Sequence, residues 1–180
     1  MPHVVVTAVG ADRPGIVAAV TRVFVDLGCN LEDSSMTNVG GQFAMMLVVD
    51  APAGVGAAEL EAALTGPAGS LDLVVAVRPV EEPVGPDPFD ESGSWTVSVY
   101  GADHPGIVHG IAELLAGEGV NISDLSTRVI GAPERPVYAM VLEVSLPPGA
   151  DPEALRTRLA ETAGRLGVDA TLHNSDADIL

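Results

Sequence analysis

The residues best suited to binding a small charged ligand stand in two loops that share one phrase. Residues 11–17 read ADRPGIV and residues 102–108 read ADHPGIV, so six of the seven letters are identical. In both places a β-branched run ends and apolar residues at helical spacing begin. The phrase therefore predicts a strand-to-helix turn whose backbone N–H groups can face an anion.

Each residue type in this turn has a physical use. Asp12 can cap the helix by accepting hydrogen bonds from first-turn N–H groups, and Pro14 fits that turn because its missing N–H is not needed there. Gly15 has no Cβ, so a small ligand can approach the backbone closely. The helix dipole favours a carboxylate, and Asp12 or Asp103 can accept from an ammonium group, which together suit a free amino acid. A capped turn that binds nothing is the alternative these residues leave open.

An asparagine follows each predicted first helix. Asn30 and Asn121 stand where the next strand should begin, and an asparagine side chain offers both a donor and an acceptor. Each can also be a simple helix-ending residue. Whether they meet the loop of their own repeat or that of a neighbouring repeat stays open at this point.

The two loops belong to two copies of one longer pattern. Gly28, Asn30, Leu31, Asp33 and Ser35 have counterparts 91 residues later, and the FAM of residues 43–45 reappears as YAM at 138–140. The first copy predicts strands at 3–9, 30–39, 42–50 and 71–77, with helices starting at Pro14 and spanning about 55–65. The second predicts strands at 94–101, 121–130, 137–146 and 168–173, with its last helix at 151–166.

This order is βαββαβ, twice, which predicts an α+β fold of two ferredoxin-like domains in tandem. We expect the first domain at residues 1–79 and the second at 94–180. Between them, residues 80–93 hold three prolines, five acidic residues and no basic one, which is typical of an extended linker.

The charge balance argues against several classes of partner. The chain has 25 acidic residues and 8 basic ones, for a net charge of −17, and no segment is basic. Direct binding of nucleic acid or of an anionic membrane surface is therefore disfavoured. No apolar run is long enough to span a membrane and the start shows no secretion signal, so we expect a cytoplasmic protein.

Catalytic and metal-binding patterns are missing from the sequence. Cys29 is the single cysteine and lacks a motif that would mark it as a nucleophile. The histidines show no metal-binding spacing, and an Asp103–His104 dyad has no counterpart in the first copy, where Arg13 stands. We expect no catalytic residue, no metal and no cofactor.

Two further stretches have structural interpretations. The NVGGQF of residues 38–43 lacks the lysine of a phosphate-binding loop and predicts a hairpin turn. Met45, Met46 and Met140 lie in strand patterns, and we expect all three in the core.

The two copies resemble ACT domains in their first halves, where a strand leads to D-R/H-P-G-I/V, a helix and G-x-N-I/L. The likeness covers both repeats and nearly all of the chain outside the linker and the last few residues. Two such units without a fused enzyme resemble the glycine cleavage system transcriptional repressor group. The resemblance implies a ligand site made of both loops and both strand starts: Asp12, Arg13, Pro14, Gly15, Ile16, Asn30, Asp103, His104, Pro105, Gly106, Ile107 and Asn121.

The resemblance also implies a function. ACT domains are regulatory modules that bind small effectors, usually amino acids, at the junction between domains, so one chain would supply both halves of an interface usually made by two. We expect a non-enzymatic sensor of a small amino acid, such as glycine or serine, that forms a homo-oligomer and acts through a protein partner. That partner is a transcription factor in one interpretation and a metabolic enzyme in the other.

Overall fold

The protein is described by a computed structural model that covers residues 3–80, 93–131 and 136–175. The chain divides into two units, residues 1–85 and 86–180. Most of the linker predicted at residues 80–93 lies outside the described residues, as do residues 132–135 in the loop where the second copy is longer.

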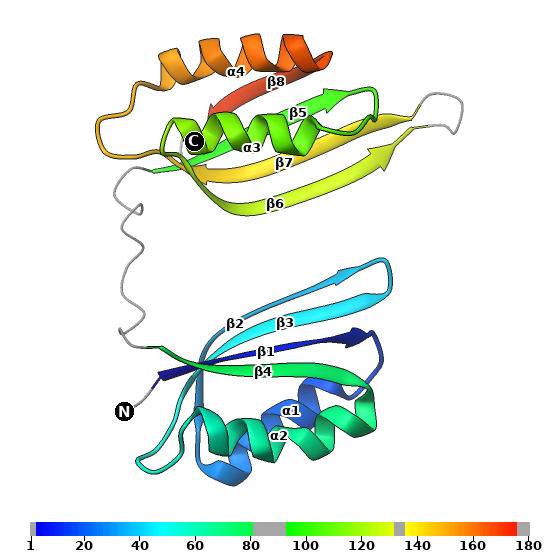
Figure 1. Ribbon diagram of the computed structural model, residues 1–180, viewed down its shortest axis with the longest axis vertical. Helices are drawn as coiled ribbons and strands as arrows, with labels where there is room; N and C mark the ends of the chain where they lie inside the picture. The colour runs from blue at the N-terminus through cyan, green and yellow to red at the C-terminus, as the bar shows by residue number, and fades with distance from the viewer. Residues whose placement is uncertain (1–2, 81–92, 132–135, 176–180) are drawn as a thin grey trace. The chain divides into compact units, whose positions relative to one another are not determined.

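Among its described residues, each unit contains four strands and two helices in the predicted order (Figure 1). The first unit consists of β1 (His3–Ala11), α1 (Ile16–Leu27), β2 (Asn30–Val39), β3 (Gln42–Asp50), α2 (Ala57–Leu71) and β4 (Leu73–Val80). The second unit consists of β5 (Ser94–Gly101), α3 (Ile107–Gly117), β6 (Asn121–Ile130), β7 (Val137–Ser145), α4 (Pro152–Leu166) and β8 (Val168–Asn174).

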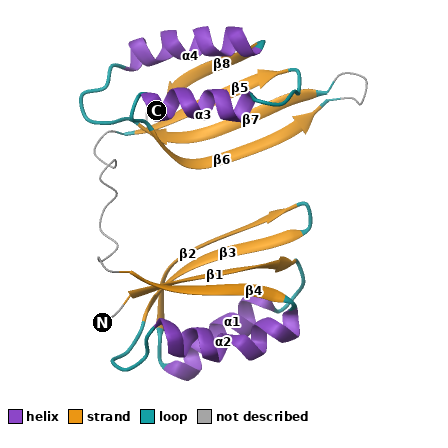
Figure 2. Cartoon of the chain, viewed as in Figure 1, coloured by secondary structure: helices purple, strands orange, loops and turns teal. Residues whose placement is uncertain are grey.

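Both sheets are antiparallel and have the same topology. The strand orders are β2-β3-β1-β4 and β6-β7-β5-β8, so β2 and β6 are edge strands. In each unit both helices cover one face of the sheet and leave the other face open (Figure 2). This is the ferredoxin-like arrangement, and the predicted fold class is confirmed.

The core of each unit lies between its helices and its sheet. Alternate residues of the central strands, such as Val4, Val6 and Ala8 of β1, are at most 1% exposed and face the helices. Helix α1 contributes Ile16, Val20 and further apolar residues at helical spacing. Because the core is almost entirely aliphatic, its stability comes from close packing of branched side chains.

The boundaries of α2 differ from the prediction. The sequence predicts an end near residue 65, but the helix continues through Pro67 to Leu71. Gly66 precedes the proline, and without a Cβ it avoids part of the steric clash that disfavours the helical conformation there. At the start, the Glu59 side chain accepts a hydrogen bond from the Gly56 N–H at 3.0 Å.

Two predictions about β3 have opposite outcomes. The hairpin before it is confirmed, with Gly40 and Gly41 both at positive φ, as the common two-residue turn requires. Met45 is buried as expected, and so is Met140 of β7. Met46 is not in the core: it is 53% exposed, because alternation along the strand turns it toward the helix-free face.

Candidate functional site

The two repeated loops have the same backbone conformation. Gly15 precedes α1 with φ 97° and ψ −9°, and Gly106 precedes α3 with φ 101° and ψ −10°. These values are unfavourable for any residue with a Cβ, which explains why glycine stands at both positions. Residues 12–15 and 103–106 are exposed, whereas Ile16 and Ile107 point into the cores.

The aspartates do not cap these helices, contrary to the prediction. Among the described residues no side chain caps α1 or α3, and neither helix has an acidic residue in its first turn. The N-cap residue is the glycine, three positions after the aspartate, and Pro14 precedes it, so the helix does not begin at Pro14 as predicted. First-turn N–H groups of both helices are therefore left for water or a ligand.

In the first unit the aspartate is held by the neighbouring hairpin instead. The Asn38 side-chain amide donates to Asp12 Oδ2 at 2.5 Å, and the Asp12 backbone N–H donates to the Gly41 carbonyl at 3.0 Å. Asn38 also accepts from the Gly41 N–H at 3.3 Å. The second unit has Val129 at the position of Asn38, so Asp103 cannot be held in the same way.

In the second unit a histidine holds the loop. His104 Nε2 lies 2.7 Å from the Leu166 carbonyl oxygen, and Nδ1 lies 3.0 Å from the Pro105 carbonyl oxygen. The Pro105 carbonyl, then the Leu166 carbonyl and, to a lesser degree, the Asp103 carboxylate raise the pKa of His104. The two loops thus share a backbone but differ in how they are anchored.

The asparagines do not meet the loops within one unit. In the first sheet Asn30 is opposite Asp50, which is opposite His3, whereas the loop follows Ala11 at the other end of β1. The nine residues of β1 span eight residue-to-residue steps, so its ends are about 27 Å apart at the usual rise per residue. In the second sheet Asn121 is opposite Ser145, which is opposite Ser94. It therefore also lies at the end of the sheet away from its loop.

A cluster that the sequence analysis missed lies beside Asn30. His3 Nε2 is 3.5 Å from Glu32 Oε2 and 3.9 Å from Asp50 Oδ1. Asp50 Oδ1 is buried and receives no hydrogen bond from the described residues. Burial first, and then the Asp50 charge, raises the pKa of the Cys29 thiol.

The same three positions of the second unit are all serine: Ser94, Ser123 and Ser145. In both sheets the register shifts at this point, between Leu31 and Asp33 and between Ile122 and Asp124. The His3–Glu32–Asp50 cluster of the first unit therefore has no ionisable counterpart at the three matching positions of the second unit. Strand register brings residues 3, 32 and 50 together, and no local motif could have revealed it.

Both edge strands next to the asparagines lie open to solvent. All ten residues of β2 are exposed, and in β6 only Ile122 is half-buried. Exposed edge strands of this length present unpaired backbone donors and acceptors that favour pairing with another strand.

The model of the ACT domain family matches the chain twice, at residues 2–78 and 96–173. The chain belongs to the ACT domain family. Each match covers one βαββαβ unit, from its first strand to its last.

Sequence relatives of this tandem ACT protein include a regulator and proteins of no stated function. It is 31% identical to the glycine cleavage system transcriptional repressor of Escherichia coli over 126 residues, which is 70% of this chain and 64% of that repressor's length. It is 40% identical to a UPF0237 protein of Methanopyrus kandleri over 78 residues, covering 42% of this chain and 87% of that protein.

Solved structures share the whole tandem fold. An unknown protein from Galdieria sulphuraria has a TM-score of 0.77 at 30% identity, with 96% of this chain and 98% of that chain covered. A protein provisionally described as a glycine cleavage system transcriptional repressor has a TM-score of 0.72 at 22% identity, with 96% of each chain covered.

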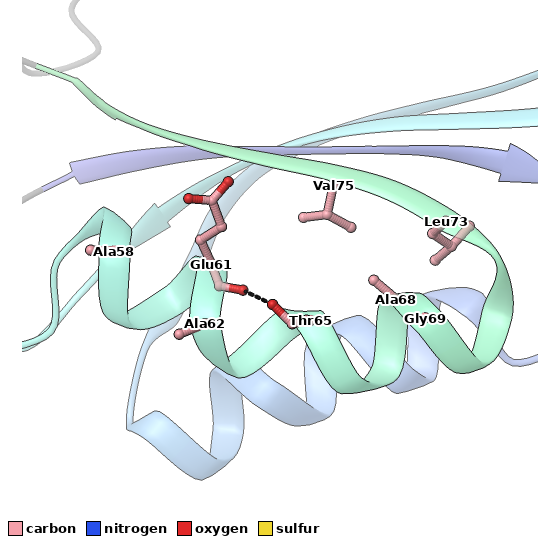
Figure 3. Close-up of a pocket in the computed structure, with 8 residues that line it drawn as sticks. All are labelled: Ala58, Glu61, Ala62, Thr65, Ala68, Gly69, Leu73 and Val75. Atoms are coloured by element: carbon pink, nitrogen blue, oxygen red, sulfur yellow. Dashed lines mark hydrogen bonds between the residues drawn. The ribbon is translucent and has the colours of Figure 1, made fainter.

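A groove elsewhere in the first ACT unit contains none of the predicted site residues. It measures about 630 Å³ and runs between α2 and the edge strand β4 (Figure 3). Small side chains such as Ala58, Ala62 and Ala68 line its helical wall, and Leu73 and Val75 line the strand. Glu61 is the one charged residue in its lining.

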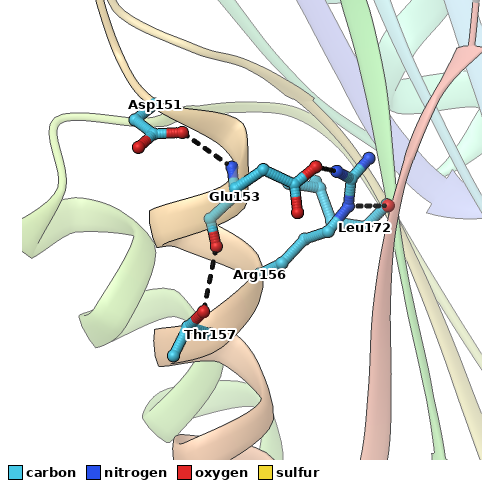
Figure 4. Close-up of polar contacts among 5 residues, drawn as sticks. All are labelled: Asp151, Glu153, Arg156, Thr157 and Leu172. Atoms are coloured by element: carbon cyan, nitrogen blue, oxygen red, sulfur yellow. Dashed lines mark hydrogen bonds and ion pairs between the residues drawn. The ribbon is translucent and has the colours of Figure 1, made fainter.

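The second ACT unit fills part of the equivalent space with an arginine. Arg156, at the position of Glu61, donates from Nε to the Leu172 carbonyl at 3.1 Å and pairs with Glu153 (Figure 4). Its guanidinium carbon lies 5.7 Å from the centre of the Trp95 ring. At the start of this helix Asp151 accepts from the Glu153 N–H at 3.0 Å, which is the N-cap that the sequence predicts.

None of the described helices has the length and apolar content needed to cross a membrane.

Proposed function

We propose that this tandem ACT protein is a non-enzymatic regulator that binds a small amino acid, with glycine and serine as the leading effectors. One observation carries the proposal. Two exposed helix N-termini, with the same glycine conformation and no side-chain cap among the described residues, follow the same Asp-x-Pro-Gly loop in both units. Such a terminus suits a ligand carboxylate.

The residues assigned to the two ligand loops are 12–16 and 103–107. The N–H groups that follow Gly15 and Gly106 receive the carboxylate, while Asp12 and Asp103 are near enough in the chain to receive an ammonium group. In the first unit the Asn38 amide already donates to the Asp12 carboxylate. Asp103 has no such donor at the matching position, so its carboxylate can accept more hydrogen bonds from a ligand ammonium group.

The asparagines join the site only if a second ACT unit is present. Asn30 and the loop lie at opposite ends of one sheet, so a single amino acid cannot touch both within a unit. When two edge strands pair antiparallel, the start of one lies beside the end of the other. We propose that exposed edges such as β2 pair in this way between two copies of the chain and bring a strand-start asparagine of one copy to a loop of the other, which also favours a homo-oligomer.

The partner is proposed to be a protein rather than nucleic acid. The E. coli relative is a transcriptional repressor, yet this chain carries a net charge of −17, which opposes contact with DNA phosphates. We therefore propose that it controls transcription of glycine cleavage genes from the cytoplasm through a partner transcription factor. The alternative is a regulatory subunit of a metabolic enzyme, and purification with a tagged chain distinguishes the two by whether a DNA-binding protein or an enzyme is retained.

Thermal unfolding of the purified chain with each of the twenty common amino acids tests the binding. A ligand that binds only the folded state raises the unfolding midpoint, by an amount that grows with its concentration. We expect a rise with one or a few small amino acids at millimolar concentration. Unchanged midpoints with all twenty would refute amino-acid sensing and leave the fold assignment intact.

A further inference from the structure

The ring of His104 is placed where only its protonated form is fully satisfied. Nε2 lies 2.7 Å from one backbone carbonyl oxygen and Nδ1 lies 3.0 Å from another. A carbonyl oxygen accepts and cannot donate, and a neutral imidazole donates from only one of its nitrogens. The imidazolium donates from both, so protonation completes the two contacts.

One of these contacts joins the ligand loop to a different element. Leu166 is the last residue of α4, and the C-terminal end of a helix favours a positive charge. The C-cap Gly167 donates to the Ala163 and Gly164 carbonyls, which leaves the Leu166 carbonyl for the histidine.

The charged side chains around the ring are few. Asp103, in the same loop, is the only one among the described residues whose charge shifts the pKa of His104. On the neighbouring helices, Arg165 of α4 donates to the Thr162 hydroxyl, and His109 of α3 pairs with Glu113. The raised pKa means that the contact stabilises the loop at low pH and is lost as the pH rises through that pKa.

The first unit has no histidine at the matching loop position. Arg13 occupies the position of His104, and an arginine stays protonated at all physiological pH values. Its loop is instead held by the bond between the side chains of Asn38 and Asp12.

We propose that His104 is a positioning residue whose protonated ring fastens the second ligand loop to the end of α4 and so makes amino-acid binding at that loop pH-dependent, while binding at the first loop is not. This rests on the proposed function, since it concerns the same loops. A neutral ring donates from one nitrogen only, so it either keeps the bond to Leu166 and leaves the Pro105 carbonyl without a donor, or keeps the bond to Pro105 and releases α4. Only the protonated ring makes both contacts at once. When the ring is neutral, the N–H groups that follow Gly106 are therefore less well ordered for a carboxylate.

We expect the affinity of the second loop to fall about fivefold between pH 5.5 and pH 8.5. A fivefold change in affinity is at the lower end of the usual range for two coupled binding events. We expect the lower end because the His104 ring is exposed to solvent.

The first experiment needs no ligand. In NMR spectra of the full chain, the His104 ring should titrate above the ordinary range of histidine, and amide signals of residues 103–107 and 166–167 should shift with the same midpoint. An ordinary midpoint, or a titration that leaves the amides of residues 166–167 unmoved, would overturn the proposal without touching the proposed function.

The second experiment measures binding at pH 5.5 and pH 8.5 by calorimetry, with whichever of the twenty amino acids raises the unfolding midpoint. His104→Gln should remove the pH-dependent part of the affinity, and His104→Arg should bind equally well at both pH values because its charge is permanent. His109→Gln is the matched control, since His109 is exposed on α3 and outside the loop.

Each outcome has one meaning. If His104→Gln keeps the pH dependence of the wild type, or His109→Gln loses it, the role of His104 is refuted and amino-acid sensing stands. If no amino acid binds at either pH, the proposed function fails and the binding part of this inference fails with it.

Discussion

Replacing Gly106 by alanine should destabilise the second unit through its backbone alone. The residue has φ 101°, and a Cβ built there would meet no atom within 4 Å, so steric contact adds nothing. A left-handed conformation costs a residue with a Cβ roughly 1–2 kcal/mol. For a unit of this size each kcal/mol lowers the Tm by roughly 4–8 °C.

The single tryptophan makes this measurable in the full chain. Trp95 lies in the second unit, half-buried, so its fluorescence during heating reports the unfolding of that unit. Gly164→Ala is the matched control: it lies within α4, no atom is within 4 Å of its Cβ position, and its φ is not positive. Alanine there should stabilise by about 0.5–1 kcal/mol. If Gly106→Ala unfolds at or above the wild-type temperature, the loop does not require glycine and the reasoning is wrong.

Three further changes have defined outcomes. Gly101→Ala should lower the Tm by more than Gly106→Ala, because its Cβ would lie 2.5 Å from a valine side chain at the start of β8; an equal or smaller loss would show that β8 moves away easily. Arg156→Ala should change the emission of Trp95 and cost about 0.5–1 kcal/mol of unfolding free energy, and an unchanged spectrum would contradict the cation–π contact. Asp50→Ser should lower the pKa of the Cys29 thiol, so that iodoacetamide alkylates it faster at pH 7.5; an unchanged rate would mean that burial alone protects it.

The parts of the fold that the sequence predicts best are those with local signals repeated twice. Strand alternation and helical spacing lead to both βαββαβ units, because each signal acts within a few residues, and the paired glycines Gly40 and Gly41 predict the hairpin of the first unit. The prediction places the end of α2 too early: proline usually ends a helix, yet α2 continues through Pro67 to Leu71, with Leu64 and Ala68 on either side of it buried.

The sequence predicts which residues make up the candidate site, but it does not predict how the fold arranges them. The two loops form the expected turns, yet Asp12 turns to Asn38, a residue 26 positions away that no capping pattern includes. The placement of Asn30 depends on strand register, which sets it at the far end of the sheet. Register also creates the His3 cluster. Contacts of this kind depend on the pairing of residues far apart in the sequence, so no repeating pattern of residue types predicts them.

NMR mapping of the bound amino acid tests the central claim most directly. The amino acid that raises the unfolding midpoint would be titrated into the full chain labelled with ¹⁵N. We predict the largest shifts at residues 12–16 and 103–107, together with the side-chain amides of Asn30 and Asn121. Shifts confined to the groove between α2 and β4, with both loops unmoved, would contradict the assignment of the ligand site.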